Sequence, residues 1–271
     1  MASEPSPLRS VVVERYVTPL REGGSLPAIV EADDLGLYVL KFRGAGQGIK
    51  ALIAELVSGG VARALDLPIP ELVLASLTAR LAQTEPDPEI QELIRASDGL
   101  NVGLDYLPGS LNFDPAVDQV SEDFASRTVW FDTLVSNVDR TARNTNMLVW
   151  QRKPWLIDHG ASLTFHHAWD GRVADPGKPF APSAQHVLLP RATQLAQVDA
   201  ELAARLSEPV LRAIVAAVPD CFLQQAAQDS DSAVLLNPES HRAAYVDYFL
   251  ARLADRSRWL QGVMDARASC V

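Results

Sequence analysis

The chain has 271 residues, of which 48% are hydrophobic and 21% are charged. This composition can supply a sizeable core, and it excludes a chain disordered throughout, a fibre or a disulfide-stabilised mini-protein. The 34 acidic and 24 basic residues give a net charge of −10 with no local basic patch, so we expect no direct binding to nucleic acid or to an anionic membrane. No segment has the apolar run of a membrane span or a signal peptide. Cys221 and Cys270 lie far apart and lack a metal-binding spacing. We therefore expect a cytoplasmic protein.

The first part of the chain is predicted to form a small sheet with one major helix. Strands are expected at residues 10–18, 27–31, 37–42, 71–77 and 101–107. The first three are short β-branched or apolar runs separated by turns, and they predict an antiparallel set. Apolar residues at helical spacing predict a helix over residues 49–65, which ends before Pro68.

Beyond residue 110 the pattern becomes mainly helical. Helical stretches are expected at residues 124–135, 194–218 and 239–264, with breaks at Pro219 and Pro238. Residues 164–190 form an irregular region that is longer than loops usually are without a function. We divide the chain into residues 10–107 and residues 108–268.

A predicted hairpin gathers three polar side chains. Residues 147–150 and 155–157 are short apolar runs joined by a polar turn, which favours two antiparallel strands. The start of the first strand and the end of the second then lie on one side. We therefore expect Asp139, Asn144 and Asp158 to lie close together.

Two carboxylates and an amide at one point suit phosphoryl transfer. Mg²⁺ bound to a nucleotide needs a few hard oxygen ligands, and Asn144 and Asp158 can supply them. Asp139 would then be free to act on the attacking hydroxyl. Each of the three alone could merely cap a turn or end a strand, so the indication comes from their joint spacing.

These motifs resemble those of a known superfold. The Asp-Arg-x3-Asn sequence at residues 139–144 and the Ile-Asp-His-Gly sequence at residues 157–160 are similar to the catalytic and metal-binding loops of HipA-like kinases and, more distantly, of phosphatidylinositol kinases. The resemblance implies an α+β, two-lobed protein-kinase-like fold, with a small antiparallel-sheet lobe at residues 10–107, a mainly helical lobe at residues 108–268, and ATP and Mg²⁺ between them. One departure is His159, which stands where the Asp-Phe-Gly motif has phenylalanine.

The resemblance also assigns a lysine and a glutamate. Lys41 ends a predicted strand and is one of only four lysines in a chain with 20 arginines. By resemblance it would hold the α- and β-phosphates, and Glu55 on the following helix would orient it. Ordinary exposed positions remain the alternative for both, and Glu71 is a weaker candidate for the partner of Lys41.

Further residues are assigned to the nucleotide by resemblance alone. They are Gly23, Gly24, Ser25, Gly103, Leu104 and Asp105. The first three resemble a phosphate-covering loop, although a turn between strands recruits glycine anyway. The last three would meet adenine at a hinge between the lobes, or form an ordinary edge strand. The glycine-rich residues 44–48 match neither a Walker A loop nor a dinucleotide fingerprint, and either a phosphate cradle or a flexible loop fits them.

Histidines and serines near these motifs allow further hypotheses. His159, His166, His167 and His186 are loosely clustered, but they lack a helical His-x3-His spacing and a cysteine partner. A lining of the irregular loop is therefore favoured over a zinc site. Ser162 and Ser183 are candidates for autophosphorylation from their position alone.

We expect an ATP- and Mg²⁺-dependent kinase that transfers the γ-phosphoryl group to a hydroxyl. The resemblance favours Ser or Thr of an unidentified protein as acceptor, and it leaves an antitoxin-like regulator open as a partner. The alternatives are a small-molecule kinase on the same fold and a non-catalytic nucleotide-binding pseudokinase. The full set of Lys41, Asp139, Asn144 and Asp158 argues against the pseudokinase.

Overall fold

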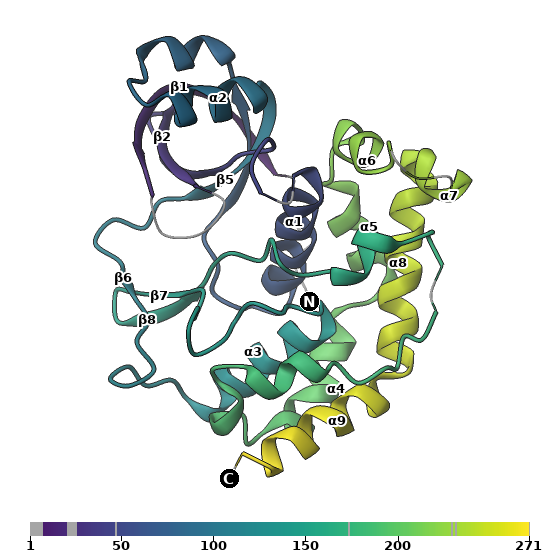
Figure 1. Ribbon diagram of the computed structural model, residues 1–271. Helices are drawn as coiled ribbons and strands as arrows, with labels where there is room; N and C mark the ends of the chain where they lie inside the picture. Colours follow the sequence, from purple (N-terminus) through teal and green to yellow (C-terminus); the bar gives the residue numbers. More distant parts are fainter. Residues whose placement is uncertain are drawn as a thin grey trace.

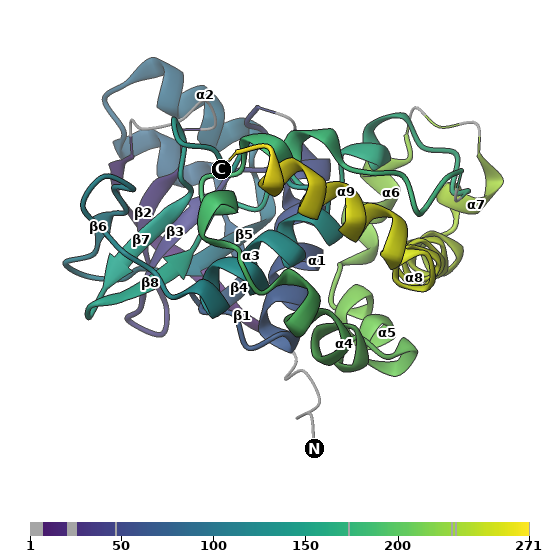
Figure 2. The ribbon, with the colours of Figure 1, turned by 90° about the horizontal axis from the view of Figure 1, so that it is seen from below.

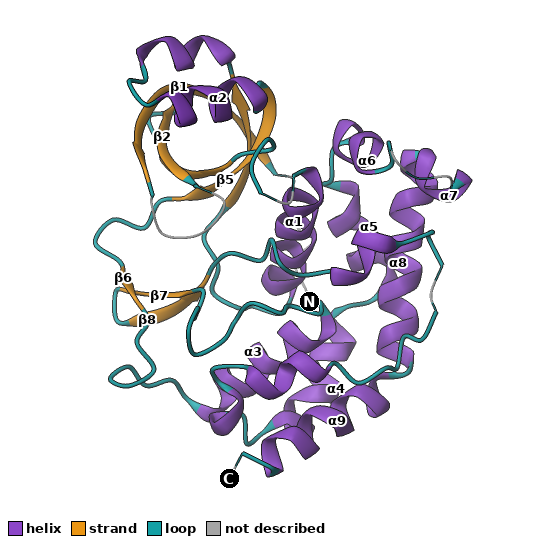
Figure 3. Ribbon diagram, in the orientation of Figure 1, coloured by secondary structure: helices purple, strands orange, loops and turns teal. Residues whose placement is uncertain are grey.

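The computed structural model of the chain describes residues 8–20, 26–46, 48–172, 174–228, 230 and 232–270. It has the mixed α+β composition that the sequence predicts, with a strand-rich part and a helix-rich part next to each other (Figures 1 and 3). None of the described helices combines the length and the apolar character needed to traverse a lipid bilayer.

The strand-rich part contains all five predicted strands, but they form a closed barrel, which the prediction of a small sheet did not include. In order around the barrel, the strands are β1 (Arg9–Pro19), β2 (Ala28–Ala32), β3 (Leu37–Lys41), β5 (Gly99–Asp105) and β4 (Leu72–Leu77). Neighbours are antiparallel except at the seam, where β1 runs parallel to β4. This seam pairs Arg9 with Val73, 64 positions away, and local periodicity carries no information on such a distant pairing.

The barrel has a hydrophobic core of its own. Alternate residues of β2 are fully buried, as expected for a strand with one face inside. The 3-10 helix η1 (Ala79–Thr84) and helix α2 (Pro88–Ala96) pack against the barrel, and Ile90 and Ile94 of α2 join its core. Helix α2 is not among the predicted elements, although Asp87 caps its N-terminus.

Helix α1 (Ile49–Ala64) lies between the barrel and the helix-rich part (Figure 1). Most of its residues are buried, because it packs against the barrel on one side and helices α5 and α6 on the other. Its Gly60 permits a close approach to α5: a Cβ at this position would lie 2.6 Å from Ile214. The helix that carries Glu55 is therefore fixed from both sides.

The helix-rich part contains more, shorter helices than predicted. They are α3 (Glu122–Leu134), α4 (Leu195–Arg205), α5 (Glu208–Ala216), α6 (Asp220–Ala226), α7 (Ala233–Leu236), α8 (Pro238–Ala254) and α9 (Arg256–Ala268). The predicted stretch 194–218 divides into α4 and α5, because Pro209 suits only the first turn of a new helix. Helix α3 contacts α4, α8 and α9. Figure 2 shows this helix-rich part from below.

A small second sheet confirms the predicted hairpin. Strands β7 (Met147–Trp150) and β8 (Lys153–Leu156) pair antiparallel, and β6 (Leu111–Asn112) joins β7. The connecting residues Gln151 and Arg152 both have positive φ, 49° and 65°, as a tight two-residue hairpin turn requires.

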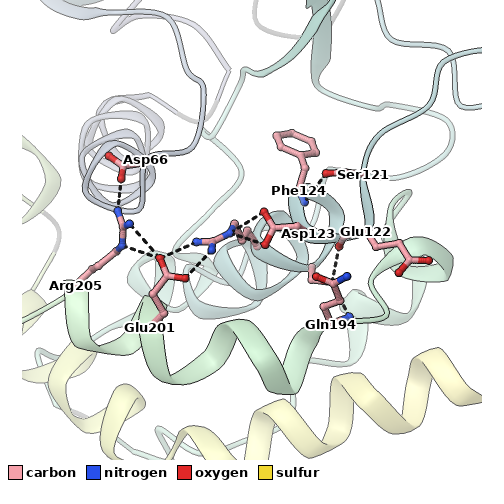
Figure 4. A network of polar contacts seen from close by, with 10 residues as sticks. Asp66, Ser121, Glu122, Asp123, Phe124, Gln194, Glu201 and Arg205 are labelled. Carbon is pink, nitrogen blue, oxygen red and sulfur yellow. Dashed lines mark hydrogen bonds and ion pairs between the residues drawn. The ribbon is translucent and has the colours of Figure 1, made fainter.

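A network of charged side chains joins the end of α1 to α3 and α4 (Figure 4). Arg205 of α4 pairs with Asp66, which follows α1, and with Glu201 one turn earlier. Arg127 of α3 pairs with Glu201 and Asp123. Because the carboxylates are exposed and the two arginines are only partly buried, each pair contributes little to stability. Together they connect three elements at the surface.

Candidate active site

The β7–β8 hairpin brings the segment before β7 next to the segment after β8. The Ile157 N–H donates to the Asn146 carbonyl oxygen over 3.0 Å, which extends the strand pairing by one step. The side-chain amides of Asn144 and Asn146 donate to Asp139 Oδ2 over 2.8 and 3.0 Å. Asp158 follows Ile157 directly. The two segments that carry the predicted catalytic and metal-binding residues therefore meet.

Lys41, at the end of β3, contacts two carboxylates. Its Nζ lies 2.5 Å from Asp158 Oδ1 and 3.4 Å from Glu55 Oε2. The Glu55 side chain is completely buried, whereas that of Asp158 is 40% exposed. The predicted ion pair between Lys41 and Glu55 is thus present. Glu71, the weaker candidate, pairs with Arg9 instead.

Burial and charge oppose each other at this ion pair. Burial disfavours charged groups, so it acts to lower the pKa of Lys41, but the nearby carboxylates of Glu55 and Asp158 outweigh it and raise that pKa. For Glu55, burial acts to raise the pKa, but Lys41 and His159 lower it to about 2. Lys41 and Glu55 are therefore both charged at neutral pH.

A cavity of about 920 Å³ lies beside these residues. Lys41, Asn144 and Asp158 supply polar groups to its wall. The apolar part of the lining includes Val39, Leu104, Leu107, Phe113, Met147, Leu148 and Ile157. A cavity of this size, with both apolar and polar residues in its wall, is typical of sites for small molecules and cofactors.

The residues assigned to the nucleotide are only partly at this cavity. Leu104 and Asp105 line it, but Gly103 does not. Gly103 is part of the barrel wall. Strand β5 is paired there with β3 on one side and β4 on the other, so the backbone of Gly103 takes part in strand pairing. The described residues 44–46 and 48 do not line it either. The predicted phosphate-covering residues Gly23, Gly24 and Ser25 lie outside the described residues.

A buried network that was not predicted supports the segment around Asp139. Its centre is Asp132, a carboxylate within α3 that is 1% exposed. Asp132 accepts hydrogen bonds from Arg140 Nε over 2.6 Å, Asn137 Nδ2 over 2.8 Å and His186 Nε2 over 2.9 Å. Burial acts to raise the pKa of Asp132, but the Arg140 charge and the His186 hydrogen bond outweigh it and lower the pKa.

This network fixes the backbone on both sides of Asp139. The Asn137 side-chain oxygen accepts the Asp139 N–H over 3.0 Å, and the Arg140 guanidinium donates to the Asn146 carbonyl. The Val187 N–H donates to the Arg140 carbonyl over 3.1 Å and so attaches the irregular region. The sequence signal that could have revealed the network is an aspartate within the apolar run of α3.

The histidines do not form one cluster; they lie at three different places in the structure. Ring nitrogens of His159 and His186 contact Glu55 and Asp132, respectively. His166, His167 and His241 line a second cavity of about 1020 Å³ beside α7 and α8. In the described part of the chain, no three His, Cys, Asp or Glu side chains are grouped as a metal site would need, so the disfavoured zinc hypothesis gains no support.

The two serines proposed for autophosphorylation are both buried. Ser162 is completely buried, and Ser183 is 5% exposed with its hydroxyl donating to the Phe180 carbonyl over 2.5 Å. Since both residues are buried in this conformation, the structure does not favour that hypothesis.

The chain is similar to solved structures and to one family model. Among solved structures, the chain is similar to the Golgi casein kinase with Mn/ADP bound, with 10% sequence identity, a TM-score of 0.47, and coverage of 98% of this chain and 75% of that chain. It is also similar to the Helicobacter pylori proinflammatory kinase CtkA, with 11% identity, a TM-score of 0.46, and coverage of 97% and 99%. No curated protein sequence matches the chain. A family model described as HipA-like kinase matches residues 13–247, most of the chain, and the chain therefore belongs to the HipA-like kinase family.

Proposed function

We propose that the protein is an ATP- and Mg²⁺-dependent phosphotransferase that transfers the γ-phosphoryl group of ATP to a Ser or Thr hydroxyl of a protein. The observation that carries the proposal is the position of Lys41, which contacts both Glu55 and Asp158 at the wall of a cavity that Asn144 also lines. Membership of the kinase family supports phosphoryl transfer. The division into residues 10–107 and residues 108–268 remains part of this proposal.

Each residue has a distinct role in the proposed reaction. The Lys41 ammonium binds phosphate oxygens of the nucleotide, and Glu55 keeps it in place. The carboxylate of Asp139, oriented by Asn144 and Asn146, positions the acceptor hydroxyl and takes up its proton. Leu104 and other apolar residues of the cavity wall exclude water from the adenine base of the nucleotide.

The available oxygen atoms suit a magnesium ion. Since Asn144 Nδ2 donates to Asp139, its Oδ1 is the atom left for a cation, and Asp158 offers a partly exposed carboxylate. When bound, the ion would neutralise phosphate charge. Asn144 and Asp158 are the residues that would hold it.

The first test is calorimetric titration with ATP, with and without Mg²⁺, on the wild type and on Asp158→Asn. Asparagine is chosen because Asp158 has φ 54°, a left-handed conformation that asparagine tolerates better than alanine does. We expect Mg²⁺-dependent binding by the wild type and at least a tenfold loss of affinity in the variant. Asp247→Asn, at an exposed position of α8 outside the cavity, is the matched control. Absence of nucleotide binding by the wild type would contradict the proposal.

The acceptor class requires a separate test. We expect γ-labelled ATP to label an array of Ser- and Thr-centred peptides in the presence of the wild type and not in the presence of Asp139→Asn. Labelling of small hydroxyl compounds in place of every peptide would favour the small-molecule kinase instead.

A further inference from the structure

His159 makes two contacts with the same buried carboxylate. Its backbone N–H donates to Glu55 Oε2 over 3.0 Å, and its ring Nδ1 lies 3.3 Å from Glu55 Oε1. The imidazole is 1% exposed, and it makes a T-shaped contact with the ring of Phe131 with the centroids 5.6 Å apart. The side chain that replaces phenylalanine in the metal-binding motif is therefore oriented toward helix α1.

The contact specifies which ring nitrogen carries the hydrogen. A carboxylate can only accept hydrogen bonds, so Nδ1 must be the donor. Nε2 is buried and has no hydrogen-bond partner among the described residues. A phenylalanine could fill the space of the ring but could not supply this donor.

Glu55 depends on His159 for much of its polar environment. A buried carboxylate needs hydrogen-bond partners, because burial without them is strongly unfavourable. Lys41 contacts Oε2, and His159 contacts both oxygens. If the imidazole donor were lost, Oε1 would lose this partner and the carboxylate could rotate away from Lys41.

These contacts close a ring of residues. Lys41 contacts Glu55, Glu55 contacts His159, His159 is bonded to Asp158 through the chain, and Asp158 contacts Lys41. The ring includes strand β3, helix α1 and the loop after β8. Moving any one of these three elements would break a hydrogen bond or ion pair made by another.

We propose that His159 is a positioning residue that fixes the Glu55 carboxylate by an Nδ1–H hydrogen bond and thereby makes the placement of Lys41 depend on the Asp158 loop. The inference deepens the proposed function and rests on it. His159 touches no reacting atom in this proposal, and it acts only through Glu55 and Lys41.

Three variants distinguish the effect of the hydrogen-bond donor of His159 from the effect of its aromatic ring. In His159→Asn, the side-chain amide places a donor near the position of Nδ1 but has no ring. In His159→Phe a ring is kept without a donor, and His159→Leu has neither. We expect Mg-ATP affinity within about threefold of the wild type for the asparagine variant, and a loss of at least tenfold for the phenylalanine and leucine variants.

A double substitution tests whether His159 acts through Lys41. In a Lys41→Met background, His159→Phe should change Mg-ATP affinity by less than twofold, because the group that His159 positions is already absent. A merely structural role would reduce affinity by the same factor in both backgrounds, and that result would overturn the inference.

The free protein provides a readout that does not depend on nucleotide. The ¹⁵N chemical shifts of the His159 ring distinguish the Nδ1–H tautomer from the Nε2–H tautomer. We expect Nδ1–H in the wild type, and a shift of this resonance in Glu55→Gln. An Nε2–H tautomer would overturn the inference even if the wild type binds Mg-ATP. A wild type with the Nδ1–H tautomer that binds no Mg-ATP would instead overturn the proposed function, and the positioning role with it.

Discussion

Asp132 is a buried carboxylate that accepts hydrogen bonds from three side chains, among them the fully buried guanidinium of Arg140. Replacement by asparagine would leave this guanidinium without a counter-charge and would direct an amide toward other donors. Removing one partner of a buried ion pair typically costs about 3–5 kcal/mol. We expect Asp132→Asn to lower the free energy of unfolding by about this amount, measured by urea denaturation.

The matched control lies on the same helix. Asp123 of α3 makes an exposed ion pair with Arg127, so Asp123→Asn should change the free energy of unfolding by less than about 1 kcal/mol. Equal losses in the two variants would show that the buried network does not stabilise the fold beyond a surface pair.

The residues that could be predicted are those whose chemistry is visible in local spacing. Lys41, Asp139, Asn144 and Asp158 lie in short motifs next to recognisable strands. In the structure Lys41, Asn144 and Asp158 line one cavity, and Asp139 accepts a hydrogen bond from Asn144 without lining the cavity itself. Asp132 and His186 are 54 positions apart and meet only through the fold. The partner of a buried charge is set by tertiary packing, which no local pattern records.

At the scale of elements, the packing of α1 against α5 is tight at one point. Gly60 has a helical backbone, and at an exposed helix position alanine would be more stable than glycine by about 1 kcal/mol. Its missing Cβ would lie 2.6 Å from Ile214, so Gly60→Ala forces the two helices apart. We expect a net loss of about 1–3 kcal/mol in the free energy of unfolding, measured by denaturant titration.

Ser58, on the same helix, provides the opposite case. Its hydroxyl is buried and, within the part of the chain that the structure describes, has no hydrogen-bond partner. Ser58→Ala removes an unsatisfied polar group and improves helix propensity, so stability should stay unchanged or rise by up to about 1 kcal/mol. If Gly60→Ala were as stable as Ser58→Ala, the prediction for Gly60 would be wrong, because α1 and α5 would then have room for a Cβ at this position.

Elements with a strong local pattern could be predicted, and their tertiary arrangement could not. Helix α1 and the β7–β8 hairpin occur where periodicity and turn residues place them. The predicted stretch 239–264 is instead two helices that meet at Asp255, where no proline or glycine marks a break. The closed barrel depends on the pairing of β1 with β4, which forms only when the whole sheet does.

At the scale of the whole molecule, buried titratable groups make stability depend on pH. Burial lowers the pKa of His241 to about 4, and it lowers the pKa of His166 well below its usual value, with further contributions from His167, Lys50 and His241. Between pH 6.5 and 4, the unfolded chain therefore binds protons that the native protein does not. Stability must fall as the pH is lowered through this range.

Acid affects the buried cluster of Lys41, Glu55 and His159 in a lower range. The pKa of Glu55 is lowered to about 2, because Lys41 and His159 outweigh its burial. The stabilisation from this carboxylate is fully present above the unfolded pKa of 4.5, and it is lost as the pH falls from there toward 2. Histidines and carboxylates thus destabilise the protein in two successive ranges of pH.

The histidine contribution can be isolated by substituting His241, whose ring stacks on Tyr245 with the centroids 5.3 Å apart. His241→Phe keeps an aromatic ring in this position but cannot bind a proton. For a pKa lowered to about 4, acidification from pH 7.5 to 5.5 should cost the wild type about 1 kcal/mol more than the variant, measured by urea denaturation at both pH values. The two proteins should differ by a constant amount above about pH 8, where the histidine is neutral in both the folded and the unfolded chain. Parallel stability curves down to pH 5 would contradict the prediction, because they would mean that the native His241 binds its proton as readily as the unfolded chain does.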